Sequence, residues 1–289
     1  MDIDLLKTFV EVANTRHFGR AAENLYLTQS AVSFRIRQLE QTLGVNLFLR
    51  QRNNIQLTTA GERLLPHAKM IITSVQRARL EVALAEGTNK QMSLAGTPNI
   101  WDAFLQFGIA NIISAMPGVS VVAEVKAQQE STRLLLERTL DMAVLFDPPK
   151  VDELKVERIF ELPILPLTSF DDCTQHNFFE NKYIYVDWGT SFALWHADLA
   201  ASKTLPYVRT STGRIALDLL LQCGGSAFIP ETLASKYLND GVLKHVEDMP
   251  RTSREVFIAY HKDNDQKEVI EKVIGILTQI TVPNDFNEE

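Results

Sequence analysis

The most informative segment of the chain reads Leu25-Tyr-Leu-Thr-Gln-Ser-Ala-Val-Ser-Phe-Arg-Ile-Arg-Gln-Leu-Glu40. Thr28 is a favourable N-cap residue, so the segment predicts a helix that begins at Gln29. Its apolar residues recur at helical spacing and form one stripe, Val32, Ile36, Leu39 and Leu43. The opposite face is short-chained at its start and basic further along, with Ser30, Ser33, Phe34, Arg37 and Gln41. Such a face can enter a major groove and contact base edges.

The residues before this segment supply the rest of a helix-turn-helix. Residues 18–25 predict a short helix in which Ala21 and Ala22 allow close packing, and residues 26–28 form a turn of suitable length. Residues 4–14 predict a further helix that completes a three-helix core. An ordinary pair of amphipathic helices in a core would show the same local pattern, so these residues alone leave both interpretations open.

A strand pair is predicted after Gly44. Residues 46–50 and 55–58 have the pattern of two short strands around a polar turn. A strand pair that follows a recognition helix is a wing, which would place Arg50 and Arg52 near phosphates or the adjacent minor groove. A solvated hairpin would explain Arg50 equally well.

A long helix is predicted next, beginning at the capping-box sequence Thr59-Ala-Gly-Glu62. Apolar residues follow on one face at alternating spacings of four and three, namely Leu64, Ala68, Ile71, Val75, Ala78, Val82 and Ala85. We call this row of apolar residues the seam. A seam of this kind favours dimerisation, and packing on the chain's own wing is the alternative. Residues 86–91 are polar and predict a linker.

From residue 91 onward, short apolar runs alternate with helical patterns. Strands are predicted at 92–95, 119–125, 142–146, 183–186, 207–209, 226–229 and 256–260. Helices are predicted at 99–115, 129–139, 191–201, 213–222, 231–238 and 266–280. This alternation is typical of an α/β domain, and we expect a parallel sheet.

Charge divides the chain in the same way. The 289 residues carry a net charge of −7, yet residues 1–90 contain twelve Lys and Arg against eight Asp and Glu, a balance of +4. Residues 91–289 contain seventeen basic and twenty-eight acidic residues, a balance of −11. A basic N-terminal part followed by an acidic remainder fits a DNA-binding module joined to a second domain.

Several other classes of protein are disfavoured. The sequence has no apolar run long enough for a membrane span and no signal-peptide pattern at its start, so we expect a cytoplasmic protein without membrane association. Cys173 and Cys223 have no metal-site spacing, and the six histidines form no metal or catalytic motif. We therefore expect no metal, no cofactor and no enzyme activity. A solute-binding protein and an α/β metabolic enzyme with a helical appendage remain as alternatives, and the first 86 residues argue against the former.

The N-terminal residues, taken in order, resemble those of the LysR-type transcriptional regulators. The matching positions are Phe9, Phe18, Ala21, Ala22, Leu25, Thr28, Gln29, Ala31, Val32, Ser33, Ile36, Arg37, Leu39, Glu40, Leu43, Gly44, Leu47, Phe48, Arg50, Leu57, Thr58, Ala60 and Gly61. So many positions in one order favour the helix-turn-helix over an ordinary helix pair. Residues 16–23, 30–37, 52–55 and 187–189 carry a closer likeness to the HdfR-type subgroup, which implies repression of the flagellar master operon.

The resemblance implies an architecture and partners for the whole chain. We expect a winged helix-turn-helix in residues 1–58, a dimerisation helix and hinge in 59–90, and a two-lobed effector domain like periplasmic binding proteins in 91–289. Lobe I would comprise about 91–161 and 256–289, and lobe II about 162–255. The implied partners are double-stranded operator DNA, a small-molecule effector, and copies of the same chain in a homodimer that assembles into a homotetramer.

The resemblance also assigns candidate DNA contacts. Base contacts are expected from Gln29, Ser30, Ser33, Phe34 and Arg37, and phosphate contacts from Arg35, Arg50 and Arg52. Ser30 stands where many members have proline, and Phe34 and Arg35 replace a usual polar or basic pair. Phe34 could contact a thymine methyl group, or it could fold back against the preceding helix.

Candidate effector contacts follow from the predicted strand ends. Ligands of two-lobed α/β domains bind at the carboxyl ends of strands, where helix N-termini suit a small organic anion. The residues in such places are Thr97, Pro98, Gln128, Gln129, Ser131, Trp188, Ser191, Thr210 and Ser211. Each Ser or Thr could instead be a simple N-cap, and Trp188 could fill a lobe core.

Overall fold

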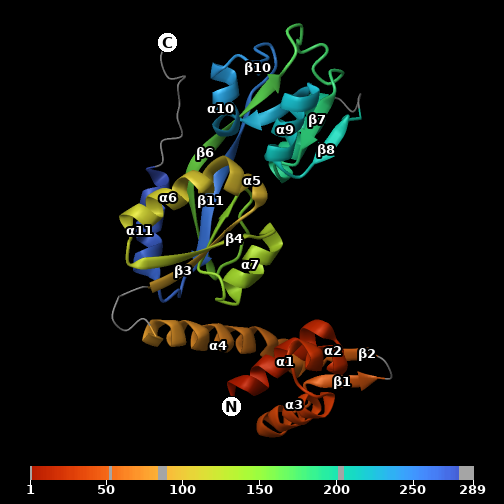
Figure 1. Ribbon diagram of the computed structural model, residues 1–289, viewed down its shortest axis with the longest axis vertical. Helices are drawn as coiled ribbons and strands as arrows, with labels where there is room; N and C mark the ends of the chain where they lie inside the picture. Colours follow the sequence, from red (N-terminus) through yellow and green to blue (C-terminus); the bar gives the residue numbers. More distant parts are fainter. Residues whose placement is uncertain (1, 52–53, 84–89, 201–204, 280–289) are drawn as a thin grey trace. The chain divides into compact units, whose positions relative to one another are not determined.

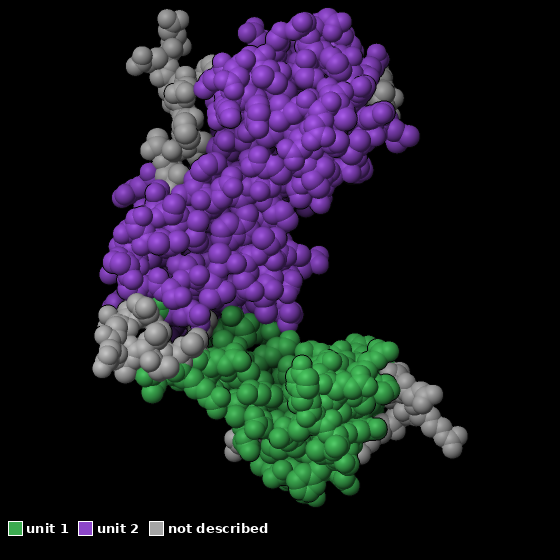
Figure 2. Space-filling view, in the orientation of Figure 1, with its two compact units in different colours: residues 1–90, 137–139 green, residues 91–136, 140–289 purple. Residues whose placement is uncertain are grey.

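The structure is a computed structural model that describes residues 2–51, 54–83, 90–200 and 205–279. It forms two compact units, residues 1–90 with 137–139 and residues 91–136 with 140–289 (Figure 2). None of the helices in the described ranges has the length and apolar character needed to cross a membrane.

The first unit is a winged helix-turn-helix followed by a long helix (Figure 1). Its elements are α1 (Ile3–Thr15), α2 (Phe18–Asn24), α3 (Gln29–Leu43), β1 (Phe48–Gln51), β2 (Asn54–Leu57) and α4 (Thr59–Ala83). Three residues of the predicted apolar stripe of α3, Val32, Ile36 and Leu39, are fully buried against α1 and α2. The fourth, Leu43, is 38% exposed at the end of the helix, so that part of the prediction was wrong. The predicted helix-turn-helix and wing are therefore confirmed.

Side chains and one glycine set the limits of these helices. The amide of Ala31 donates a hydrogen bond to Thr28 Oγ1 (3.2 Å), so Thr28 caps α3 as predicted. Gly44 ends α3 with φ +71°, a left-handed conformation that glycine adopts without strain. The capping box predicted at Thr59 is displaced by one residue, because Thr58 Oγ1 accepts from Gly61 N (3.1 Å) and donates to Asn46 O (2.8 Å).

The second unit is built on one sheet with helices around it. Its strands are β3 (Lys90–Gly96), β4 (Val119–Val125), β5 (Met142–Leu145), β6 (Leu154–Thr168), β7 (Tyr183–Val186), β8 (Val208–Thr210), β9 (Ser226–Pro230), β10 (Lys244–His245) and β11 (Thr252–His261). Its helices are α5 (Pro98–Ile100), the π-helix η1 (Trp101–Leu105), α6 (Gln106–Ala115), α7 (Gln128–Leu136), α8 (Thr190–Ala200), α9 (Gly213–Cys223), α10 (Glu231–Asn239) and α11 (Lys267–Thr278). The predicted helices all have counterparts here.

The sheet is mixed, and the expectation of a parallel sheet was wrong. Its order is β4-β3-β5-β11-β6-β9-β7-β8, with β10 paired to β6. The pairs β3–β5, β7–β8 and β7–β9 are parallel. The pairs β5–β11, β11–β6 and β6–β9 are antiparallel. The long strands β6 and β11 thus join two halves of one sheet (Figure 1). We call the half with β3, β4 and β5 lobe I and the half with β7, β8 and β9 lobe II.

The sequence did not predict β6, and it predicted β11 to begin four residues late. Pro163 and Pro166 lie within β6, and proline in a sequence usually argues against a strand. The first part of β6 contains several charged residues, of which Lys155, Arg158 and Glu161 are exposed. The neighbouring strand β11 begins with the polar residues Thr252, Ser253 and Arg254, which hid its start. Long-range pairing with β11 therefore overrides the local pattern.

Candidate nucleic-acid interface and candidate ligand site

Helix α3 has one buried face and one exposed face. Val32, Ile36 and Leu39 are buried in the core of the first unit, which fixes the rotation of the helix. The predicted base-contacting residues lie on the other side, where Gln29, Ser30, Phe34 and Arg37 are exposed and Ser33 is half-buried. An exposed polar face opposite a buried apolar stripe is common to a recognition helix and to the ordinary amphipathic helix that was the alternative.

Phe34 and Arg35 have different surroundings on this helix. The ring of Phe34 is 61% exposed, so it does not fold back into the core of the helical unit. The guanidinium of Arg35 donates from Nη1 to Thr8 Oγ1 of α1 (3.4 Å), which leads its side chain along the flank of α3. Phe34 is the one apolar side chain among the predicted base-contacting residues, and a partner that covered its ring would remove apolar surface from water.

The wing is attached to α3 through a buried carboxylate. Glu40 Oε1 accepts hydrogen bonds from Leu47 N (2.9 Å) and Phe48 N (3.4 Å), and Glu40 is only 9% exposed. Arg50 lies on β1 of the wing, and the structure does not describe its side chain. Arg52 lies outside the described residues. Glu40 was not singled out as a site residue from the sequence, because a charged residue on a helix is usually solvent-exposed.

The seam lies on α4 and changes its surroundings along the helix. Leu64, Ala68 and Ile71 pack into the core of their own unit, so the alternative of packing on the same chain holds for this half. Further along, Val75 is half-buried, Ala78 is exposed and Val82 is 75% exposed. Ala85 lies outside the described residues. The apolar face therefore continues beyond the part of the chain that covers it.

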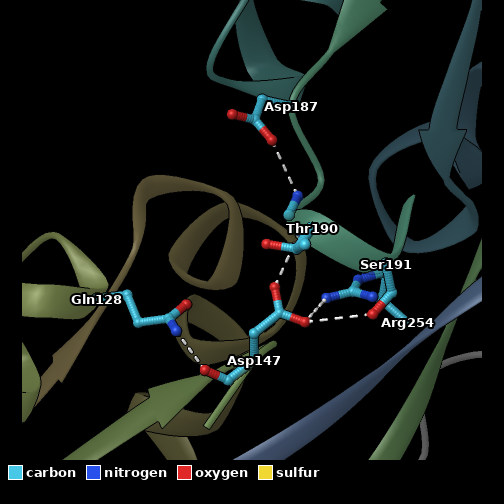
Figure 3. A network of polar contacts seen from close by, with 7 residues as sticks. Gln128, Asp147, Asp187, Thr190, Ser191 and Arg254 are labelled. Carbon is cyan, nitrogen blue, oxygen red and sulfur yellow. Dashed lines mark hydrogen bonds and ion pairs between the residues drawn. The ribbon is translucent and has the colours of Figure 1, made fainter. Parts of the chain in front are cut away.

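Lobe I and lobe II are joined by a network of polar contacts around Asp147 (Figure 3). Asp147 follows β5 of lobe I, and its Oδ1 accepts from Arg254 Nη2 (2.6 Å) and from Ser191 Oγ (3.4 Å). Its Oδ2 accepts from Thr190 N (3.1 Å), at the N-terminus of α8 in lobe II. Gln128 Nε2 of α7 donates to the backbone oxygen of Asp147. The strand ends of both lobes thus meet at one carboxylate.

Asn99 makes a second connection between the lobes. It lies in α5 of lobe I, and its Nδ2 donates to the backbone oxygens of Asp187 (2.9 Å) and Ser211 (3.1 Å) in lobe II. Its Oδ1 accepts from Gly213 N (2.8 Å) at the start of α9. One buried amide side chain therefore holds the ends of β7 and β8 against lobe I.

Asp102, three residues after Asn99 in the chain, has a raised pKa. Burial raises the pKa of Asp102 in η1 above its ordinary value, Arg214 of α9 opposes that shift, and Asp218 of α9 adds to it. A negative charge at this position is therefore less favourable than in water.

The structure brings together some predicted effector residues and separates others. Gln128 and Ser191 join the network around Asp147, and the backbone of Ser211 binds Asn99. Thr97 is the N-cap residue of α5 without using its hydroxyl for capping, and Pro98 is exposed beside it. Thr210 Oγ1 accepts from Thr212 N (3.2 Å), a local turn contact, and Gln129 is exposed.

Two predicted effector residues are buried. Trp188 is fully buried and its Nε1 donates to Phe228 O (2.9 Å), so it fills the core of lobe II, the second of its two expected roles. Ser131 is also fully buried within the start of α7.

The central residues Asp147, Arg254 and Asn99 were missed. Asp147 directly follows a predicted strand, and the strand-end rule would have found it. Arg254 gave no such signal, because it lies 107 residues from Asp147 on the part of β11 that was not predicted.

Comparison with known families places both parts of the chain in one group. Residues 3–62 match the model described as "Bacterial regulatory helix-turn-helix protein, lysR family". Residues 85–281 match the "LysR substrate binding domain". The "HTH-type transcriptional regulator HdfR" of Yersinia enterocolitica is 39% identical in an alignment of 283 positions that covers 95% of each chain. These matches confirm the resemblance inferred from the sequence, including the HdfR-type likeness.

Solved structures agree in fold. Full-length CbnR complexed with its target DNA has a TM-score of 0.67 at 18% identity, covering 96% of this chain and 99% of that one. LysG from Corynebacterium glutamicum, described with bound effector Arg, has a TM-score of 0.59 at 16% identity, covering 96% and 98%. At these identities the likeness concerns the fold.

Proposed function

This chain belongs to the LysR family of DNA-binding transcriptional regulators, and from that premise we propose which residues contact the operator and the effector. The exposed face of α3 enters the major groove, with base contacts from Gln29, Ser30, Ser33, Phe34 and Arg37. Arg35, Arg50 and Arg52 contact phosphates. The observation that carries this proposal is the 61% exposure of Phe34 on a helix whose other face is fully buried.

Phe34 and Arg35 should differ in how their loss affects DNA binding. We expect Phe34→Ala to lower the affinity about tenfold for operators that carry T·A at the contacted step, because the ring covers a thymine methyl. The affinity for operator variants without that T·A pair should change little. Arg35→Ala should weaken binding to every sequence and reduce the salt slope by about one, as loss of a phosphate contact does. Fluorescence anisotropy with operator variants at several salt concentrations measures both effects. Equal affinity of Phe34→Ala and wild type for all variants would refute the base contact.

We propose that two chains pair through the exposed half of the seam on α4. Val75, Ala78 and Val82 supply an apolar face that the rest of their own chain leaves open. Pairing places two α3 helices on one operator, and association of two dimers gives the homotetramer. On this proposal residues 1–58 bind DNA, 59–90 connect and dimerise, and 91–289 form the regulatory part.

We propose further that the ends of the strands in lobe I and lobe II form the effector site, and that the effector is a small organic anion. The donors around Asp147 support this chemistry, because a guanidinium, a helix N-terminal amide and a hydroxyl converge there. The protein acts in the cytoplasm, where its operator is. The flagellar master operon, implied by the HdfR-type likeness, stays the predicted target.

A further inference from the structure

The contacts around Asp147 make up a complete anion-binding arrangement whose anion is a side chain of the same chain. Arg254 Nη2 lies 2.6 Å from Asp147 Oδ1, and Ser191 Oγ lies 3.4 Å from the same oxygen. The amide of Thr190, at the N-terminus of α8, lies 3.1 Å from Oδ2. Donors from β11 and from α8 thus satisfy both carboxylate oxygens (Figure 3).

Gly189 leaves room for the carboxylate of Asp147. Gly189 has φ +96°, and a Cβ at this position would lie 2.6 Å from Asp147 Oδ2 and 3.0 Å from Arg254 Nη2. Any side chain here would therefore collide with the ion pair. The turn that precedes α8 leaves the space that a carboxylate fills.

Arg254 requires an anion at this place. Its side chain is only 5% exposed, and its Nε has no hydrogen-bond partner among the described residues. A buried guanidinium without a counter-charge is strongly unfavourable, so the site is stable only while some anion occupies it. In this structure that anion is the carboxylate of Asp147.

We propose that Asp147 is an internal substitute for the effector anion, which holds the two lobes together without a ligand. This inference rests on the proposed effector site and concerns its regulation. A free carboxylate reaches Arg254 and Thr190 only by displacing Asp147. The carboxylate of Asp147 therefore maintains the contact between the lobes in the absence of a metabolite, and an effector anion has to compete with it for Arg254 and Thr190.

The strength of the competition follows from tethering. A side chain held beside its site competes at an effective concentration in the millimolar range or above. Removal of the Asp147 carboxylate should therefore raise the affinity for a small free carboxylate by at least tenfold.

The test uses the full-length chain and formate, which replaces the carboxyl group that Asp147→Ala removes. In chloride we expect Asp147→Ala to melt at a lower temperature than wild type. Tens of millimolar formate, at matched ionic strength, should raise its melting temperature saturably, while wild type does not respond. Tryptophan fluorescence gives the formate dissociation constants for the comparison.

Asp187→Ala is the matched control. Asp187 Oδ1 accepts from Gly189 N (3.0 Å) in the same turn, and its removal leaves the pair of Asp147 and Arg254 in place. This variant should respond to formate no more than wild type does. If the loss of any carboxylate near α8 is enough to cause the response to formate, Asp187→Ala will respond as well. That result would overturn the proposal.

Other outcomes are equally decisive. Equal formate affinity in wild type and Asp147→Ala would show that Asp147 does not compete for the site. If Asp147→Ala does not fold in chloride, it should fold when formate is added. If formate fails there, Asp147→Ser is titrated in the same way, and a flat response overturns the proposal. Operator binding of wild type is measured separately, so loss of the proposed DNA contacts would be distinguished from failure of this inference.

Discussion

Val82→Asp in α4 should abolish the dimer and lower operator affinity by about 100-fold or more. Val82 is 75% exposed in the single chain, so the substitution leaves the fold of that chain intact. In a paired seam, however, the new carboxylate would be buried against an apolar partner. Each monomer would then bind one half-site without the gain from binding two at once. Sedimentation measures the oligomeric state, and anisotropy with full and half operators measures the affinity.

Gln76→Asp is the control for this prediction. Gln76 is exposed on α4 outside the seam, so the same charge there should change neither the oligomeric state nor the affinity for the full operator. A Val82→Asp protein that sediments like wild type would contradict dimerisation through the exposed half of the seam.

Glu40→Ala should destabilise the winged helix-turn-helix by roughly 2–4 kcal/mol. The Glu40 carboxylate accepts the amides of Leu47 and Phe48, and its loss leaves two buried donors unpaired. The wing would separate from α3, and operator binding would fall with it. Urea unfolding followed by circular dichroism gives the stability, and hydrogen exchange at Leu47 and Phe48 reports the local opening.

Glu40→Gln provides the comparison. Its side-chain oxygen can still accept the two amides, so this variant should retain most of the stability and the slow exchange at Leu47 and Phe48. If Glu40→Ala and Glu40→Gln exchange equally slowly at those two amides, the carboxylate does not hold the wing.

The helix-turn-helix could be predicted because its signals are local. The N-cap at Thr28, the apolar stripe of α3 and the glycine at its end lie within seventeen residues, and apart from the exposed Leu43 each has the structural role that its chemistry suggests. The sequence could not choose between an exposed and a folded-back Phe34, since that depends on how α2 packs against α3. The structure favours exposure.

The seam shows a limit of periodicity. The spacing of Leu64 through Val82 is regular, yet Leu64, Ala68 and Ile71 face the chain's own core whereas Val82 is exposed. Periodicity identifies an apolar face and does not say what covers it. The core of the first unit covers the seam only as far as Ile71, so the residues beyond it are left for another partner.

The candidate ligand site was only partly predictable. Strand ends located Gln128 and Ser191, because that rule needs only the order of strands and helices. The ion pair of Asp147 and Arg254 depends on the antiparallel pairing of β5 and β11, which brings distant segments together. The polar start of β11 concealed the position of Arg254, and the internal anion with it.

The most direct test of the central claim is a binding titration with the DNA upstream of the chain's own gene. We predict saturable binding by full-length protein with a dissociation constant on the order of 10⁻⁸ M or below, and at least about 10³-fold weaker binding to unrelated DNA of equal length. Footprinting of the complex should protect two half-sites about one helical turn or a multiple apart. Equal affinity for upstream and unrelated DNA, with no protected half-sites, would contradict sequence-specific recognition by α3.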